Sequence, residues 1–112
     1  MNIVRRPIHA LALVCAAMAL YACAGGGGTT KESDAILTGQ VRSLQAQGHR
    51  LLDRGEHQLA KARFEEARQL AESVDDLPGL IRSLNDLGAV AVLDGDPTGA
   101  IQLHQQALAL AE

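Results

Sequence analysis

Three histidines beyond the first forty residues, His49, His57 and His104, are the first side chains to test for metal binding. His49 and Asp53 are four residues apart, which would place both side chains on one face of a helix. Two ligands do not complete a zinc site, and His57 lies beyond Gly55, where a helix would end. We therefore predict no metal site and assign structural roles to the imidazoles, with that of His104 partly buried.

Acidic and serine side chains are no better placed for catalysis. Glu65 and Glu66 are adjacent rather than opposed across a cleft, as are Asp75 and Asp76, so neither pair suits general acid-base chemistry. The serines lie in no nucleophile-turn motif and have no histidine and acid at a motif spacing. We therefore predict no catalytic residue and no enzymatic activity.

Helices are the elements that would position these side chains. The chain has 112 residues, enough for one small domain, and contains 19 Ala and 17 Leu, whereas aromatic residues make up 2%. Because Ala and Leu favour helices, we predict an all-α fold. The net charge of -3 and the scarcity of rings that could stack on bases exclude nucleic acid as an expected partner.

The first 22 residues have the composition of a signal peptide. Arg5 and Arg6 precede an uncharged apolar run of about 13 residues, 10–22. A helix needs about 20 apolar residues to cross a bilayer, so a permanent transmembrane span is the weaker interpretation. Cys15 lies within this segment and would be removed with it, so no disulfide is expected.

The residues that end this run, Leu20-Tyr21-Ala22-Cys23, resemble the lipobox of bacterial lipoproteins, with Tyr21 a departure at its tolerant position. The resemblance implies cleavage before Cys23 and covalent lipid on its thiol, and we expect no other cofactor. Because Ala24 follows, and not the Asp that acts as a retention signal, it also implies an anchor in the outer membrane of a diderm host, facing the periplasm. An ordinary secretory signal or a buried cysteine is the alternative.

Residues 23–33 include four successive glycines and predict a flexible tether. A phosphate-binding glycine loop is disfavoured because no Lys-Ser/Thr pair follows at the required spacing. Residues 23–112 carry 8 basic and 13 acidic side chains, a net charge of -5, so lipid rather than charge would hold the chain on a membrane. Residues 34–112 form the predicted helical domain.

The helical domain repeats itself after 40 residues. Superposing residues 41–72 on 81–112 gives ten identities in 32 positions, where composition alone would give about two or three. The identical pairs are Arg42/Arg82, Ser43/Ser83, Leu44/Leu84, Gly48/Gly88, Gly55/Gly95, Ala60/Ala100, Ala67/Ala107, Leu70/Leu110, Ala71/Ala111 and Glu72/Glu112.

The first repeat has the sequence pattern of two helices. Asp34 is the predicted N-cap of a helix that ends near Asp53, and Gly55 separates it from a second helix over residues 56–72. The buried face of this second helix is predicted to comprise Leu59, Ala60, Phe64, Ala67 and either Leu70 or Ala71.

The second repeat shows the same pattern. Asp76 is predicted to cap a helix that has Pro78 in its first turn and ends near Leu93. Asp96 is predicted to cap the last helix, which has Pro97 at its first position, where the missing N–H is harmless. Four helices joined by short turns are therefore expected.

These positions resemble the signature of tetratricopeptide repeats, in which Leu, Gly, Ala and an aromatic ring recur at fixed spacing. The matching residues are Leu44, Gly48, Leu51, Ala60 and Phe64, then Leu84, Leu87, Gly88, Ala91, Ala100 and His104 in place of the ring. The resemblance implies two antiparallel helix-turn-helix repeats, about 41–74 and 81–112, in a short α-solenoid. Small residues would let the paired helices approach closely, and the predicted packing positions are Gly48, Ala60, Phe64, Ala67, Gly88, Ala100 and Ala107. The period of 40 rather than about 34 predicts that residues 73–78 lengthen a helix or a loop.

In this family the first helix of each repeat lines a concave groove that receives a segment of a partner protein. The residues that we place in the groove lie beside the core stripe and are Arg42, Gln45, His49, Arg82 and Asn85. Arg42 and Arg82 could offer guanidinium groups to carboxylates of the partner. A solvated helix face without a partner is the alternative.

We therefore expect a lipid-anchored repeat scaffold that binds a protein in the bacterial cell envelope, for envelope, pilus or secretion assembly. Two repeats are few, because each repeat buries its face on a neighbour, and an apolar face after Leu108 would be left open. A self-associating structural element, which would be a homo-oligomer, or a truncated fragment of a longer repeat protein is the alternative.

Overall fold

The computed structural model of the protein describes residues 29–112. Four helices follow one another: α2 (Thr29–Asp53), α3 (His57–Ser73), α4 (Leu77–Leu93) and α5 (Pro97–Ala111). The chain divides into residues 1–33 and a compact unit of residues 34–112. The predicted signal peptide, Cys23 and the tether glycines lie outside the described residues. Within the described residues, no helix is both long enough and apolar enough to cross a membrane.

Turns between the helices follow the sequence signals closely. Gly55 and Gly95 have φ angles of 76° and 77°, the left-handed conformation that glycine adopts at little cost. The Asp76 carboxylate accepts a hydrogen bond of 3.0 Å from the Gly79 N–H, and Asp96 caps α5 in the same way. The predicted caps of α4 and α5 are therefore confirmed.

The start of α2 differs from the prediction. The helix begins at Thr29, so Asp34 lies inside it and is not its N-cap, and residues 29–33 are helical rather than part of a tether. No Gly or Pro interrupts this segment, and Glu32 in the first turn interacts favourably with the positive end of the helix dipole. The described part of α2 therefore includes residues 29–33, which the sequence pattern assigns to the tether.

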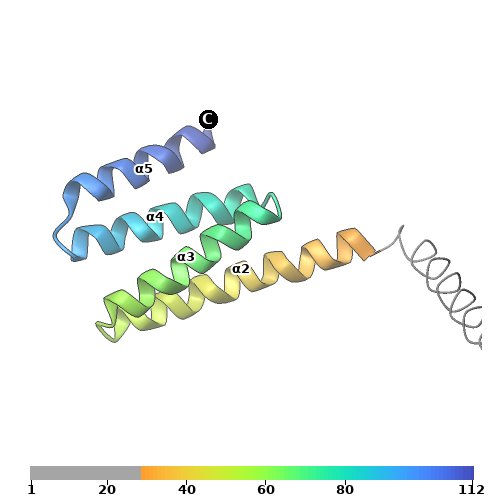
Figure 1. Cartoon of the computed structure of the whole chain (residues 1–112), viewed down its shortest axis with the longest axis horizontal. Helices are drawn as coiled ribbons and strands as arrows, with labels where there is room; N and C mark the ends of the chain where they lie inside the picture. Colours follow the sequence, from red (N-terminus) through yellow and green to blue (C-terminus); the bar gives the residue numbers. More distant parts are fainter. Residues whose placement is uncertain (1–28) are drawn as a thin grey trace, which may run out of the picture. The chain divides into compact units, whose positions relative to one another are not determined.

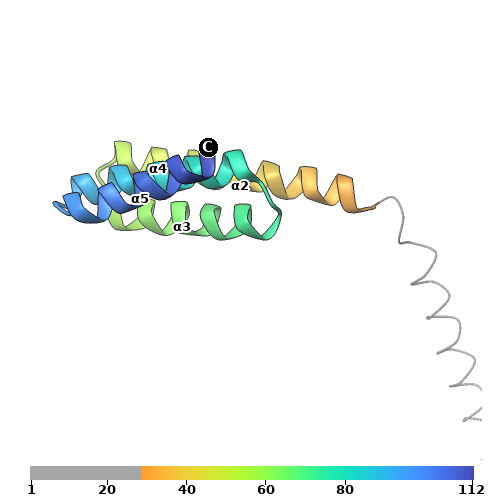
Figure 2. The same ribbon diagram turned by 90° about the horizontal axis from the view of Figure 1, so that it is seen from above.

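Each repeat is an antiparallel helix pair held by a glycine facing a ring. A Cβ atom added at Gly48 of α2 would lie 2.3 Å from Cε1 of Phe64 in α3, so only glycine permits this approach. At Gly88 of α4 the equivalent ring is that of His104 in α5, 2.7 Å from an added Cβ. Figures 1 and 2 show α3 lying beside α2 and α4, with α5 beside α4.

Stacking of the second repeat on the first buries one side of α2 and α3. Val41, Phe64 and Ala71 are each at most 1% exposed. Their equivalents 40 residues later, positions 81, 104 and 111, are only partly buried or exposed, because no described helix follows α5. The apolar core therefore lies within the first repeat and at its junction with the second, and contains Ala60, Phe64, Leu87 and Val90 in one cluster and Val41, Ala67 and Ala71 in another.

One apolar position does not behave as the helix pattern predicts, and the open choice between two others is decided. Leu59 is 56% exposed rather than buried, because no described helix covers the side of α3 on which it lies. At the end of α3, Ala71 is buried whereas Leu70 is only partly buried, which settles the alternative between them. The extra residues of the 40-residue period mainly lengthen helices, since α3 continues to Ser73 and α4 begins at Leu77.

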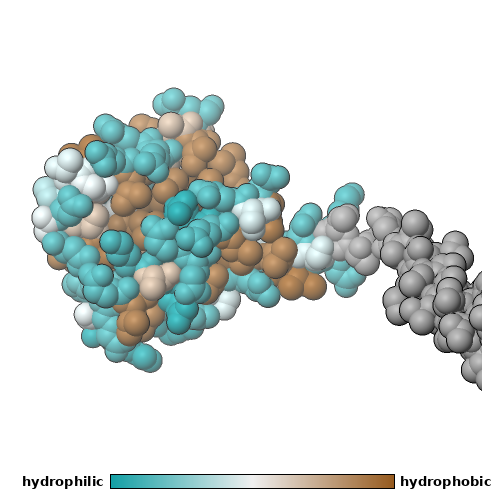
Figure 3. Space-filling model, viewed as in Figure 1, coloured by the Kyte–Doolittle hydropathy of each residue, from teal (hydrophilic) through white to brown (hydrophobic). Residues whose placement is uncertain are grey.

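The face of α5 away from the core is apolar. Ile101 is 57% exposed and Leu108 is 61% exposed. Figure 3 shows hydrophobic surface over α4 and α5, bordered by hydrophilic side chains. An open apolar face at this end of the second repeat is therefore present, as expected.

Candidate functional site

The two arginines that recur one repeat apart meet at a single pocket. Arg42 of α2 and Arg82 of α4 are both exposed and make no ion pair within the described part of the chain. The pocket between them has a volume of about 240 Å³, and we call it the α2/α4 groove. It is lined by Thr38, Arg42, Gln45, Asp76, Pro78, Gly79 and Arg82.

Gln45 holds the two repeats together rather than facing a partner. Its side chain is 3% exposed, and Nε2 donates hydrogen bonds of 2.9 Å to the Gly79 carbonyl and to Ser83 Oγ. The prediction that Gln45 is a partner-binding residue is therefore wrong. The position lies beside the core stripe of α2, as expected, but α4 packs over it.

His49 also joins α2 to α4. Its Nε2 lies 3.3 Å from Oδ1 of Asp86, and its ring meets the ring of Phe64 edge-on, with a centroid separation of 5.1 Å. Burial raises the pKa of Asp86, although the nearby His49 and Arg82 act in the opposite direction. Asp86 Oδ2 is buried and has no hydrogen-bond partner. His49, with a half-exposed side chain, is thus committed to a contact between repeats.

Asn85 extends the surface from α4 toward α5. The residue is exposed, and its Oδ1 lies 3.0 Å from Nδ1 of His104. His104 is also exposed, which corrects the expectation of a partly buried imidazole, although its ring still covers Gly88. A second pocket of about 550 Å³ borders Asn85 and shares Pro78 and Arg82 with the α2/α4 groove. Its lining residues are Leu77, Pro78, Ile81, Arg82, Asn85, Asp86, Leu110 and Ala111.

Together these two pockets form a surface with mixed chemistry. Arg42, Arg82 and Asn85 provide donors, whereas Leu77, Ile81 and Leu110 provide apolar contacts. Sequence reasoning missed the apolar contributors, because Leu77 and Ile81 belong to α4 whereas Leu110 comes from the end of α5. The sequence indicated them only through the apolar residues at the start of α4 and at the end of α5.

Metal-binding geometry is not found in the described part of the chain. No group of three or more His, Cys, Asp or Glu side chains converges among residues 29–112. His57 Nδ1 lies 3.4 Å from Asp94 Oδ1, which links the start of α3 to the end of α4. The histidines that could be tested for metal binding therefore have ionic or hydrogen-bond partners within the fold.

The comparisons with known proteins agree with this architecture. The family model of the tetratricopeptide repeat matches residues 40–112. No match was found among curated protein sequences or among solved structures. Because the matched segment covers well over half of the sequence and spans both helix pairs, the chain belongs to the tetratricopeptide repeat family.

Proposed function

We propose that this protein is a membrane-anchored scaffold that recruits a protein partner in the bacterial cell envelope through the α2/α4 groove. Tetratricopeptide repeats bind proteins and are typically non-catalytic. The observation that carries the proposal is the convergence of Arg42 and Arg82 on one groove. Both guanidinium groups are exposed, so they can form bidentate contacts with carboxylates without first breaking an internal ion pair.

The groove favours a partner segment that combines acidic and apolar side chains. Arg42 and Arg82 would hold carboxylates, and the adjacent pocket offers Leu77, Ile81 and Leu110 to an apolar side chain. Each exposed ion pair contributes about 0.2–1 kcal/mol, so the apolar contacts are needed to reach useful affinity.

A pull-down with the full-length, membrane-extracted protein tests the groove. The Arg42→Glu/Arg82→Glu variant should lose a partner that the unaltered protein retains, as identified by mass spectrometry. Lys31→Glu/Lys61→Glu is the matched control, because it makes the same charge change at exposed residues outside both pockets. Retention of every partner by the Arg42/Arg82 variant would contradict the role of the groove.

Anchoring is the second part of the proposal and rests on Leu20-Tyr21-Ala22-Cys23. Two or three acyl chains on Cys23 would hold the protein durably, since each buried CH₂ adds about 0.8 kcal/mol. Metabolic labelling with a fatty-acid analogue should mark the unaltered protein and leave Cys23→Ser unlabelled. Equal labelling of both proteins, or labelling of neither, would contradict lipidation at this residue. Fractionation of a diderm host would then test whether the protein lies in the outer membrane.

Self-association is a second candidate function, favoured by the exposure of Ile101 and Leu108 on α5. Apolar repeat faces are normally covered by a neighbouring repeat. Analytical ultracentrifugation of the detergent-solubilised chain distinguishes the two functions. A monomer whose mass does not change with concentration would exclude self-association and leave the scaffold proposal standing.

A further inference from the structure

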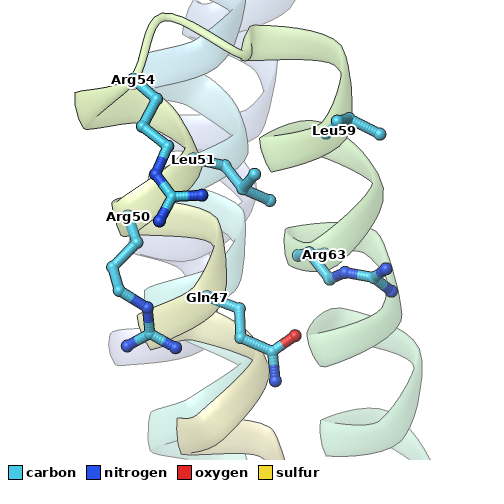
Figure 4. Close-up of a pocket in the computed structure, with 6 residues that line it drawn as sticks. All are labelled: Gln47, Arg50, Leu51, Arg54, Leu59 and Arg63. Carbon is cyan, nitrogen blue, oxygen red and sulfur yellow. The ribbon is translucent and has the colours of Figure 1, made fainter.

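A basic pocket lies between α2 and α3 and shares no residue with the α2/α4 groove. Its volume is about 250 Å³. Figure 4 shows that its lining side chains come from α2, from Arg54 in the turn after α2, and from α3. The lining residues are Gln47, Arg50, Leu51, Arg54, Leu59 and Arg63.

The charge of this pocket is opposite to that of the chain around it. Residues 29–112 carry 8 basic and 13 acidic side chains, yet the pocket is lined by three arginines and no acid. Arg63 pairs with Glu66 at 2.6 Å, whereas Arg50 and Arg54 make no ion pair in the described part of the chain. Two exposed guanidinium groups are thus available to a ligand.

Apolar surface accompanies this charge. Leu59 is 56% exposed, and Leu51 is partly buried beside it. In Figure 4, Leu51 and Gln47 extend from α2 toward α3, and the two free arginines follow the outer side of α2. A ligand for this pocket therefore needs an apolar group with negative charge beside it.

The internal repeat shows what kind of element fits such a pocket. All six lining positions have equivalents 40 residues later that line one pocket in the second repeat, namely Leu87, Val90, Ala91, Asp94, Gly99 and Leu103. Lys61 and Glu65 of α3, together with the cap residue Asp96, complete that second pocket. In the second repeat, therefore, the groove between paired helices receives a third helix. No described helix occupies the equivalent groove in the first repeat.

Two segments of this chain that could cover the basic pocket do not complement its charge. By the same repeat relation, α5 of a second copy would take the place of α3, with Ile101 and Gln105 replacing Lys61 and Glu65. That substitution brings no carboxylate to the arginines. Residues 1–28 contain no Asp or Glu either. Covering Arg50 and Arg54 without a counter-charge would carry a desolvation cost, which disfavours both occupants.

We infer that the basic pocket binds an amphipathic helix of a different protein, which presents carboxylates beside an apolar side chain. The apolar side chain packs against Leu51 and Leu59, and the carboxylates pair with Arg50 and Arg54. This inference rests on the proposed scaffold function only in that the ligand is a protein. It adds a second binding surface on the first repeat.

Fluorescence anisotropy with the full-length chain in detergent micelles tests the inference. The probe is a labelled 18-residue helical peptide with a leucine stripe flanked by glutamates, and the matched probe has glutamine at every glutamate. We expect the acidic peptide to bind at least about tenfold more tightly than its glutamine counterpart, with an affinity that falls as salt is added.

Variants then locate the binding site. Arg50→Glu/Arg54→Glu should weaken binding of the acidic peptide about tenfold or more, and Leu59→Ser should weaken it severalfold. Lys31→Glu/Lys61→Glu makes the same charge change at exposed residues outside both grooves and should leave the affinity unchanged. All of these side chains are exposed, so circular dichroism should show an intact fold in each variant.

Several results would overturn the inference. These are equal binding of the two peptides, an equal loss in the Lys31/Lys61 variant, or no binding at millimolar peptide. A fourth is that the peptide does not bind, whereas anionic phospholipid vesicles bind in a manner that depends on Arg50 and Arg54. That result would identify the pocket as a lipid contact. Loss of the α2/α4 partner in the pull-down bears only on the other groove, so the two proposals fail separately.

Discussion

Gly48 and Gly88 occupy equivalent positions in the two repeats, yet substitution by alanine should affect stability differently. An alanine Cβ at position 48 would lie 2.3 Å from Phe64, whose side chain is completely buried and has no space to move into. Overpacking costs about 1–3 kcal/mol, and we expect the cost of this contact to lie toward the upper end of that range. Alanine recovers about 1 kcal/mol through its helix propensity. Gly48→Ala should therefore lower the free energy of unfolding by about 1–2 kcal/mol.

At position 88 the obstructing ring can move away. The nearest atoms to an added Cβ belong to His104, which is exposed and can rotate into solvent. This rotation breaks one hydrogen bond to Asn85, a loss of about 0.5–1.5 kcal/mol. The helix propensity of alanine offsets most of that loss. Gly88→Ala should leave stability nearly unchanged.

Urea unfolding followed by circular dichroism at 222 nm measures both changes. Thermal unfolding should place Gly48→Ala about 5–15 °C below the unaltered chain, because about 1 kcal/mol corresponds to about 4–8 °C in a domain of this size. The double variant Gly48→Ala/Phe64→Leu should be no less stable than Phe64→Leu alone, since the smaller side chain makes room for the methyl group. Equal effects at positions 48 and 88, or no rescue by Phe64→Leu, would refute the packing argument.

Three further predictions concern single side chains. Gln45→Leu should destabilise the chain by about 1–3 kcal/mol in urea unfolding, because Ser83 and a backbone carbonyl lose their buried donor. Burial raises the pKa of Asp86, so the folded state binds this proton more tightly than the unfolded state, and stability should fall as pH rises from about 3.8 through the folded pKa. Asp86→Asn should remove that part of the fall. Urea midpoints at pH 3.5 and 7 measure the pH dependence of stability, and an equal dependence in the variant and the unaltered chain would contradict this reasoning. Leu59→Ser should change the unfolding free energy by less than about 0.5 kcal/mol, because more than half of the side chain is already exposed, and a larger loss would show that Leu59 packs in the core.

Helix boundaries could be predicted from the sequence where the signal lies within a few residues. Asp76 and Asp96 cap α4 and α5 through hydrogen bonds from backbone N–H groups three residues away. Gly55 and Gly95 adopt the left-handed conformation that most other residues avoid, although Asp75 also adopts it in the turn before α4. The start of α2 was mispredicted because Asp34 has the chemistry of a cap but no helix-breaking residue precedes it closely. A good cap residue permits a helix to start without requiring it.

Pairing within each repeat was also encoded in the sequence, because it depends on residues with unusual size. Gly48 leaves space that a ring fills, and the spacing to Phe64 allows an antiparallel partner to supply that ring. The same relation between Gly88 and His104 recurs after 40 residues. Composition and the 40-residue repeat predicted four helices, and the resemblance to tetratricopeptide repeats supplied their antiparallel pairing.

Only the tertiary structure decided which side chains of each helix are available to a partner. Gln45 and Asn85 hold equivalent positions, yet α4 covers Gln45 whereas Asn85 is exposed. Leu59 has the apolar character of a core residue but lies on a side of α3 that no described helix covers. A helical sequence determines which residues share a face, whereas burial of that face depends on the neighbouring helix packed against it.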